Sequence, residues 1–214
     1  MKHLQAEKYN LAWFRLAECV SRREKERALG VYRLLSHSLG DRALAAQLYG
    51  DLLICFGDDC AIEKYLEAAQ LYKKSKKIIE AIAVYEHLIF LDSTSKDYFF
   101  EILELYKILD LQDKMVPHVK RLIKENKVDI AIGIVKKIET SIKRESLADL
   151  NKSLVFLVLK SKSKSPEEIE EQIKRTIDSI IDADNSMLLQ EFLSELKSIN
   201  VDYYLNACCY IEDK

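Results

Sequence analysis

Apolar residues recur at intervals of three and four along nearly the whole chain, and strict alternation over the length of a strand is hard to find. This pattern predicts helices throughout. We expect them at residues 3–21, 24–38, 41–55, 60–74, 77–91, 96–109, 112–125, 127–140, 146–160, 166–182, 185–198 and 201–210. Because the connections are short, neighbouring helices should form antiparallel hairpins, and the expected fold class is all-α.

The predicted breaks between helices have local causes. Gly-Asp pairs at 40–41 and 57–58 each supply a glycine that accepts left-handed backbone, followed by an acidic start for the next helix. Residues 92–95 read Asp-Ser-Thr-Ser and offer several capping side chains. Residues 165–168 read Ser-Pro-Glu-Glu, which is capping-box order with a first-turn proline.

Apolar positions also return after 34 residues, a spacing typical of helical repeats. Small residues let two helix axes approach closely, and aromatic rings fill the space at their crossing. In a unit that starts at 62, these positions are Tyr65, Ala68, Ala69, Tyr72, Ala81, Tyr85 and Leu88. In the next unit they are Phe99, Ile102, Leu103, Tyr106, Met115, Val119 and Leu122.

These positions resemble the tetratricopeptide repeat family, most closely over 62–127 and less so over 26–140. The resemblance implies an α-solenoid of antiparallel helical hairpins that winds into a right-handed superhelix. Residues 1–140 would be repeats with an N-terminal capping helix, and 141–214 a helical extension that continues or caps the array. Outside the best-matching units, Val31, Leu34 and Leu35 fit the same spacing upstream. Ala45, Tyr49 and Leu52 fit only if two residues have been inserted, and Ala131, Ile134, Val135 and Ile138 fit downstream with two removed.

Two alternatives stay open at this point. The stretch from Tyr49 to Ala69, with Gly50 at a small-residue site, also fits a unit in the opposite helix phase. The sequence therefore leaves undecided which side of the helices faces inward. Helical solenoids of other repeat families give similar hydrophobic patterns.

The resemblance also implies a binding surface, because five positions of each first helix line a concave groove in the family. Leu66 and Phe100 would be apolar pockets flanked by charges, which suits an extended peptide or a partner helix. Chaperone-binding members clamp a terminal carboxylate with Lys and Asn where this chain has Leu66 and Gln70, so we expect no such clamp. The chain's own C-terminal helices are an alternative occupant. The groove residues are Glu63, Leu66, Gln70, Lys73, Lys74, Asp97, Phe100, Glu104, Lys107 and Ile108.

The first predicted helix is apolar on more than one side, with Leu11, Trp13, Phe14 and Leu16. Such a helix either caps the array or is buried in a larger assembly, including a homodimer.

Composition restricts the class of protein. Only 5 Gly and 2 Pro occur among 214 residues, which excludes most β architectures and disorder. The 5 Cys form no CxxC pair and no signal peptide starts the chain, so we expect a cytoplasmic protein. No apolar run is long enough to span a bilayer, and we expect no membrane insertion.

Charge is distributed unevenly. Residues 112–164 carry 13 basic and 6 acidic side chains, whereas residues 165–214 carry 4 and 12. The basic segment could bind phosphates, so a nucleic-acid-binding regulator is the alternative function. It lacks the interleaved aromatic residues that stack on single strands, and we expect its charge to be neutralised by the acidic helices of this or a neighbouring chain.

Candidate chemistry is sparse, and we expect no catalytic residues, no cofactor and no metal. Residues 57–59 read Gly-Asp-Asp but lie between two predicted helices, where they end one and start the next. None of the histidines, His3, His37, His87 and His118, is spaced to share a metal on one helix face. The adjacent Cys208 and Cys209 have no neighbour that would lower a thiol pKa. The predicted function is a protein-protein interaction scaffold or adaptor, whose partner is a protein or peptide.

Overall fold

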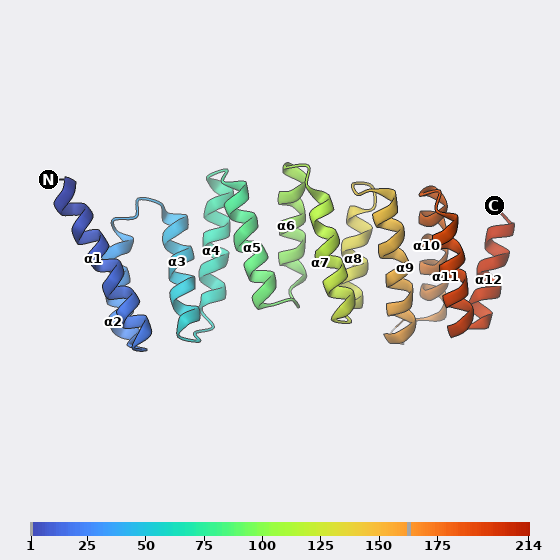
Figure 1. Ribbon diagram of the computed structural model, residues 1–214, viewed down its shortest axis with the longest axis horizontal. Helices are drawn as coiled ribbons and strands as arrows, with labels where there is room; N and C mark the ends of the chain where they lie inside the picture. The colour runs from blue at the N-terminus through green and yellow to red at the C-terminus, as the bar shows by residue number, and fades with distance from the viewer. Residues whose placement is uncertain (1, 162–163) are drawn as a thin grey trace. The chain divides into compact units, whose positions relative to one another are not determined.

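The computed structural model describes residues 2–161 and 164–214, with side chains from Leu11 onward. This part of the chain forms twelve α-helices and contains no strand (Figure 1), which confirms the all-α prediction. Each predicted helix is present. The helices are α1 (Lys2–Ser21), α2 (Lys25–Ser36), α3 (Arg42–Cys55), α4 (Ala61–Lys74), α5 (Ile78–Leu91), α6 (Lys96–Ile108), α7 (Met115–Lys124), α8 (Val128–Ile138), α9 (Arg144–Ser161), α10 (Pro166–Asp182), α11 (Ser186–Ile199) and α12 (Val201–Glu212), with a short 3-10 turn at Gln112–Lys114.

The helices form two compact units, residues 1–105 and 106–214, and the boundary falls within α6. In the first unit α1 packs on α2, and α4 packs between α3 and α5. In the second unit each helix from α7 to α12 packs on the next, and α12 also packs on α10. Consecutive helices run antiparallel within each unit (Figure 1).

Several helices end in the same turn, a residue in left-handed backbone conformation followed by an amide that bonds back into the last helical turn. At the end of α3, Gly57 has φ 67° and the amide of Asp58 donates to the carbonyl of Leu53 at 3.0 Å. At the end of α4, Lys76 has φ 58° and the amide of Lys77 donates to Tyr72 at 2.9 Å. This arrangement satisfies carbonyl groups at the helix end and reverses the chain sharply. Non-glycine residues in the same conformation also follow α1, α6, α7 and α10: Arg23, Asp110, Asn126 and Asp184.

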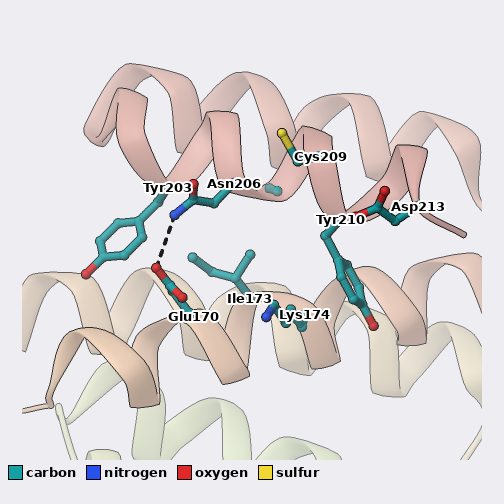
Figure 2. A pocket seen from close by; sticks show the side chains of 9 residues that line it. Glu170, Ile173, Lys174, Tyr203, Asn206, Cys209, Tyr210 and Asp213 are labelled. Atoms are coloured by element: carbon teal, nitrogen blue, oxygen red, sulfur yellow. Dashed lines mark hydrogen bonds between the residues drawn. The ribbon is translucent and has the colours of Figure 1, made fainter.

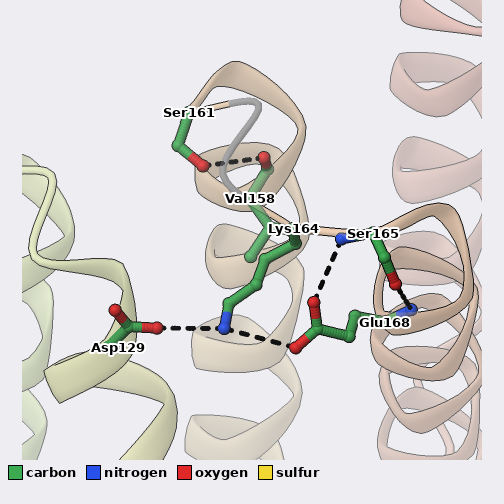
Figure 3. A network of polar contacts seen from close by, with 6 residues as sticks. All are labelled: Asp129, Val158, Ser161, Lys164, Ser165 and Glu168. Carbon is green, nitrogen blue, oxygen red and sulfur yellow. Dashed lines mark hydrogen bonds and ion pairs between the residues drawn. The ribbon is translucent and has the colours of Figure 1, made fainter.

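Two of the predicted helix starts are confirmed, at Asp41 and at Ser165. The carboxylate of Asp41 accepts the amides of Ala43 at 2.9 Å and Leu44 at 3.3 Å, which caps α3. At the start of α10 the Ser165 hydroxyl accepts the amide of Glu168, and the Glu168 carboxylate accepts the amide of Ser165 (Figure 3). Both caps use amides that would otherwise lack a partner at the helix start.

Every repeat position predicted between 65 and 122 is buried. The downstream positions Ala131 to Ile138 are buried as well. Upstream the prediction was wrong for Leu34, whose side chain is 74% exposed. Helix α2 buries the face that carries Ala28, Tyr32 and Leu35, and Leu34 lies outside that face.

Helices α3 and α4 approach each other closely at Gly50. A Cβ added to Gly50 would meet ring atoms of Tyr65 at 3.0 Å, so the ring lies directly over the glycine backbone. The Tyr65 hydroxyl donates to Asp51 at 2.7 Å, which holds the ring in place. Burial, and then the Asp51 carboxylate, raise the pKa of the Tyr65 phenol. This packing fixes α4, the helix that carries the first half of the predicted groove.

Helix α1 confirms the expectation of apolar residues on more than one side. Trp13 and Leu16 face α3, where they line an apolar pocket of about 230 Å³ with Leu52. Leu11 and Phe14 are exposed. One side of α1 is therefore used within the first unit and another is open.

Candidate partner-binding surface

The predicted groove residues of α4 lie on its accessible face. Glu63, Gln70 and Lys74 are exposed, and Leu66 and Lys73 are partly buried. The opposite face of the helix carries the buried repeat residues, so the helical period separates core from surface. An apolar side chain thus lies among charged and polar ones on the face that was predicted to bind a partner.

On α6 the predicted residues are also accessible. Asp97 and Glu104 are exposed and Phe100 is partly buried. Lys107 and Ile108 are exposed as well, but they lie beyond the boundary of the first unit. Within the first unit, the predicted surface therefore consists of the five residues on α4 and of Asp97, Phe100 and Glu104.

Glu101, which sequence reasoning missed, joins these two helices. Its carboxylate forms an ion pair with the ammonium group of Lys73, so the end of α4 lies beside α6. The same carboxylate lies next to Tyr85 of α5. Burial, and then Glu101, raise the pKa of the Tyr85 phenol to about 12. Nothing in the repeat pattern marks Glu101, because its role depends on which helices meet there.

Helix α5 carries an exposed apolar stripe that the sequence analysis also missed. Ile79 and Phe90 are each 71% exposed, and the exposed Ala83 lies between them on the same face. A signal for this stripe was present, because α5 reads IIEAIAVYEHLIFL and is apolar nearly all round. A helix of that kind has more apolar surface than one core contact can cover.

Ion pairs within the second unit engage some of the cations of the basic segment 112–164. Lys120 pairs with Asp149 at 2.7 Å. The side chain of Lys152 is only 13% exposed and pairs with Glu195 at 2.9 Å and with Glu191 at 3.2 Å. Both glutamates belong to α11, so the expectation that acidic helices of the same chain neutralise basic ones is confirmed for Lys152.

Lys164 makes a second connection of this kind between α8 and α10. Figure 3 shows its ammonium group between Asp129 at 3.0 Å and Glu168 at 3.3 Å. Hydrogen bonds to these two carboxylates raise the pKa of Lys164. The cation is therefore engaged within its own unit.

A cleft of about 340 Å³ lies between α10 and α12 (Figure 2). Across it, the amide of Asn206 donates to Glu170 at 3.1 Å. The ammonium group of Lys174 lies 5.6 Å from the centre of the Tyr210 ring, and the Tyr210 hydroxyl donates to Asp178 at 3.1 Å. These contacts hold α12 on α10 along a polar seam.

The described residues offer little further chemistry. No group of three or more His, Cys, Asp or Glu among them is placed to hold a metal ion. Asp58 accepts the amide of Cys60 and pairs with Lys25 at 2.7 Å, so it serves the turn between α3 and α4. The prediction for His3 concerns a side chain outside the described residues. None of the described helices is both long enough and apolar enough to cross a membrane.

Comparison with known proteins adds no relative. No protein-family model matches the chain, and no curated protein matches it. Inference about function therefore starts from the surfaces described above.

Proposed function

We propose that the chain is a protein-interaction scaffold whose helices form a tetratricopeptide-like α-solenoid with a right-handed superhelical wind. Burial of the repeat positions on both helices of each repeat unit supports this architecture. The left-handed turn residues Lys76 and Asp110 lie 34 residues apart, which matches the spacing of the apolar pattern. Helical hairpins that repeat along a chain should have the same turn at the same position of each unit.

The observation that carries the binding proposal is the ion pair between Lys73 and Glu101. It joins Lys73, on the accessible face of α4, to α6 within the first unit, which supports a surface that includes faces of both helices. Leu66 and Phe100, the partly buried apolar residues of these faces, then lie among exposed charged residues. Partly buried apolar side chains give a partner something to bury, and surrounding charges select its orientation.

A peptide or a helix of another protein fits this composition best. The surface carries both acidic and basic side chains, so it does not select a strongly charged ligand. Specificity would come from two apolar anchors of the partner, spaced to reach Leu66 and Phe100. The ion pairs of Lys120, Lys152 and Lys164 favour this proposal over nucleic-acid binding, since cations held by carboxylates release fewer counterions on contact with phosphates.

The test is affinity capture from cell extract, with bound proteins identified by mass spectrometry. Leu66→Glu combined with Phe100→Glu should lose the partner, because both anchors become charged. Ile79→Glu combined with Phe90→Glu is the matched control, since it adds the same two charges to α5 of the same unit. The control should keep the partner.

Folding of each variant is checked by circular dichroism before capture. If the groove variant does not fold, charge reversal at the exposed Glu63 and Glu104 replaces it and should weaken capture. A groove variant that folds and retains every partner of the wild type would remove this surface from the proposal.

A further inference from the structure

A second surface, on α1 and α2, is independent of the proposed function. Residues of these two helices line an open groove of about 750 Å³. Four arginines line it and only two glutamates do, so the groove is basic. The lining arginines are Arg15, Arg22, Arg27 and Arg33.

Part of this positive charge is unopposed by the described residues. Arg22 pairs with Glu18 at 2.7 Å and Arg27 with Glu24 at 3.0 Å, each along its own helix. Arg15 and Arg33 form no ion pair with the part of the chain that the structure describes. Residues 2–36 together carry eight basic and four acidic side chains. The groove therefore favours an acidic occupant.

The groove also has an apolar floor, and it contains a glycine that the packing of its own unit does not require. Leu34, 74% exposed, and Val31 both line it. Gly30 lies in the middle of α2, and a Cβ added there would meet nothing within 4 Å. Glycine inside a helix costs about 1 kcal/mol relative to alanine, and the fold of the unit does not require it here. Close approach of a second helix backbone does require a small residue at such a place.

Helix α12 has the properties that this groove selects. Its contact side packs on α10 through Asn206 and Tyr210. Its outer side presents Val201 and Leu205, which are four residues apart and both exposed. This spacing makes one apolar stripe along the helix.

Acidic side chains flank that stripe. Asp202 and Glu212 are exposed on α12 itself. Residues 165–214, which form α10 to α12, carry 12 acidic and 4 basic side chains. Helices α12 and α2 are each 12 residues long, so the two helices can lie alongside each other over their whole length.

We propose that the groove between α1 and α2 binds α12 of a second copy of this chain. Val201 and Leu205 would lie on Val31 and Leu34, with the α12 backbone close to Gly30. The acidic residues of α12 would face the groove arginines. Because the two contacting surfaces differ, the contact is heterologous, and copies joined by it form either an open chain or a closed ring.

The proposal is tested by sedimentation velocity over a micromolar to submillimolar range of protein. The wild type should self-associate as its concentration rises, and added salt should weaken this association because charges steer the contact. Gly30→Trp places a large ring at the groove, at a position where an added Cβ meets nothing within 4 Å. Leu205→Glu breaks the stripe, and Asp202→Lys with Glu212→Lys reverses its flanking charge. Each variant alone should weaken association about tenfold or more.

The deciding measurement is a mixture of Gly30→Trp protein with Leu205→Glu protein. The first has an intact α12 and the second an intact groove, so the mixture should give a one-to-one dimer that grows no further. Phe90→Glu, on α5, is the control and should associate like the wild type.

A wild type that stays monomeric over the whole range overturns the proposal, and the groove would then have to serve a different acidic helix. Association that survives in the Leu205→Glu variant alone also overturns it, because that result means a symmetric contact. Loss of association in Phe90→Glu places the contact elsewhere and has the same consequence.

Discussion

Gly50→Ala should destabilise the first unit, although alanine is the better helix former. The added Cβ would lie 3.0 Å from Cδ1 and Cε1 of Tyr65 and 3.1 Å from Cζ. Carbon atoms pack best at about 3.5–4.0 Å, so either α3 and α4 must separate or the ring must move. The ring has little freedom, because Tyr65 is buried and its hydroxyl is bound to Asp51.

The magnitude follows from two opposing terms. Forcing an extra methyl group into a packed contact costs about 1–3 kcal/mol. Replacing a helical glycine with alanine contributes about 1 kcal/mol in favour of the folded state. We therefore expect a net loss of up to about 2 kcal/mol in the free energy of unfolding.

Gly30→Ala is the matched control in the same unit. Gly30 is also helical, but an added Cβ meets nothing, so only the favourable term applies. This variant should gain about 0.5–1 kcal/mol. The two substitutions are chemically identical and are predicted to have opposite signs.

Urea unfolding followed by far-ultraviolet circular dichroism measures both changes as shifts in midpoint at constant slope. A further variant isolates the ring: in a Tyr65→Leu background, Gly50→Ala should become neutral or stabilising. Coupling between the two positions should be about 1–3 kcal/mol. If Gly50→Ala and Gly30→Ala shift the midpoint equally, the close contact between α3 and α4 does not govern stability.

Three further predictions concern single residues. The pKa of Asp58 is lowered from its usual 3.8 to about 2, first by the hydrogen bond from Lys25, so its contribution to stability is present above pH 3.8 and is lost as pH falls toward 2. The Asp58→Asn variant should therefore match the wild type in urea midpoint near pH 2 and fall below it at neutral pH. Equal midpoints at neutral pH would contradict this. Lys152→Gln leaves the two α11 glutamates without their cation and should cost about 1–2 kcal/mol at neutral pH, with an unchanged midpoint as the contrary result. Ala69→Trp overfills a fully buried position on α4 and should cost about 1–3 kcal/mol or more by the same assay, whereas a neutral effect would mean that this crossing tolerates a large ring.

Local chemistry made the helices predictable. Asp41 and Ser165 cap helices through amides two or three residues away, and Gly57 ends one through its own backbone angle. These interactions are complete within a few residues, so the sequence order contains all their partners. The buried side of most helices was predictable for a similar reason, because the helical period places residues three and four apart on one face.

The candidate binding surface was predictable only in part. The positions on α4 and α6 are accessible, as expected, but Glu101, which joins them, carries no mark in the pattern. Leu34 fitted the interior spacing but is exposed. Phe90 lies in an apolar helix and is also exposed. Each case depends on whether a neighbouring helix covers that side, and the sequence of one helix does not show which other helix packs against it.

The sequence by itself thus determined the helices, their ends and which residues share a face, because backbone hydrogen bonds and capping act over a few residues. The tertiary structure alone decided which faces are covered. Tyr65 lies on Gly50, the α11 glutamates pair with Lys152, and the groove of α1 and α2 stays open among the described residues. That choice depends on the distance and angle between helices far apart in the chain. Packing of many side chains sets both, and no single local interaction does.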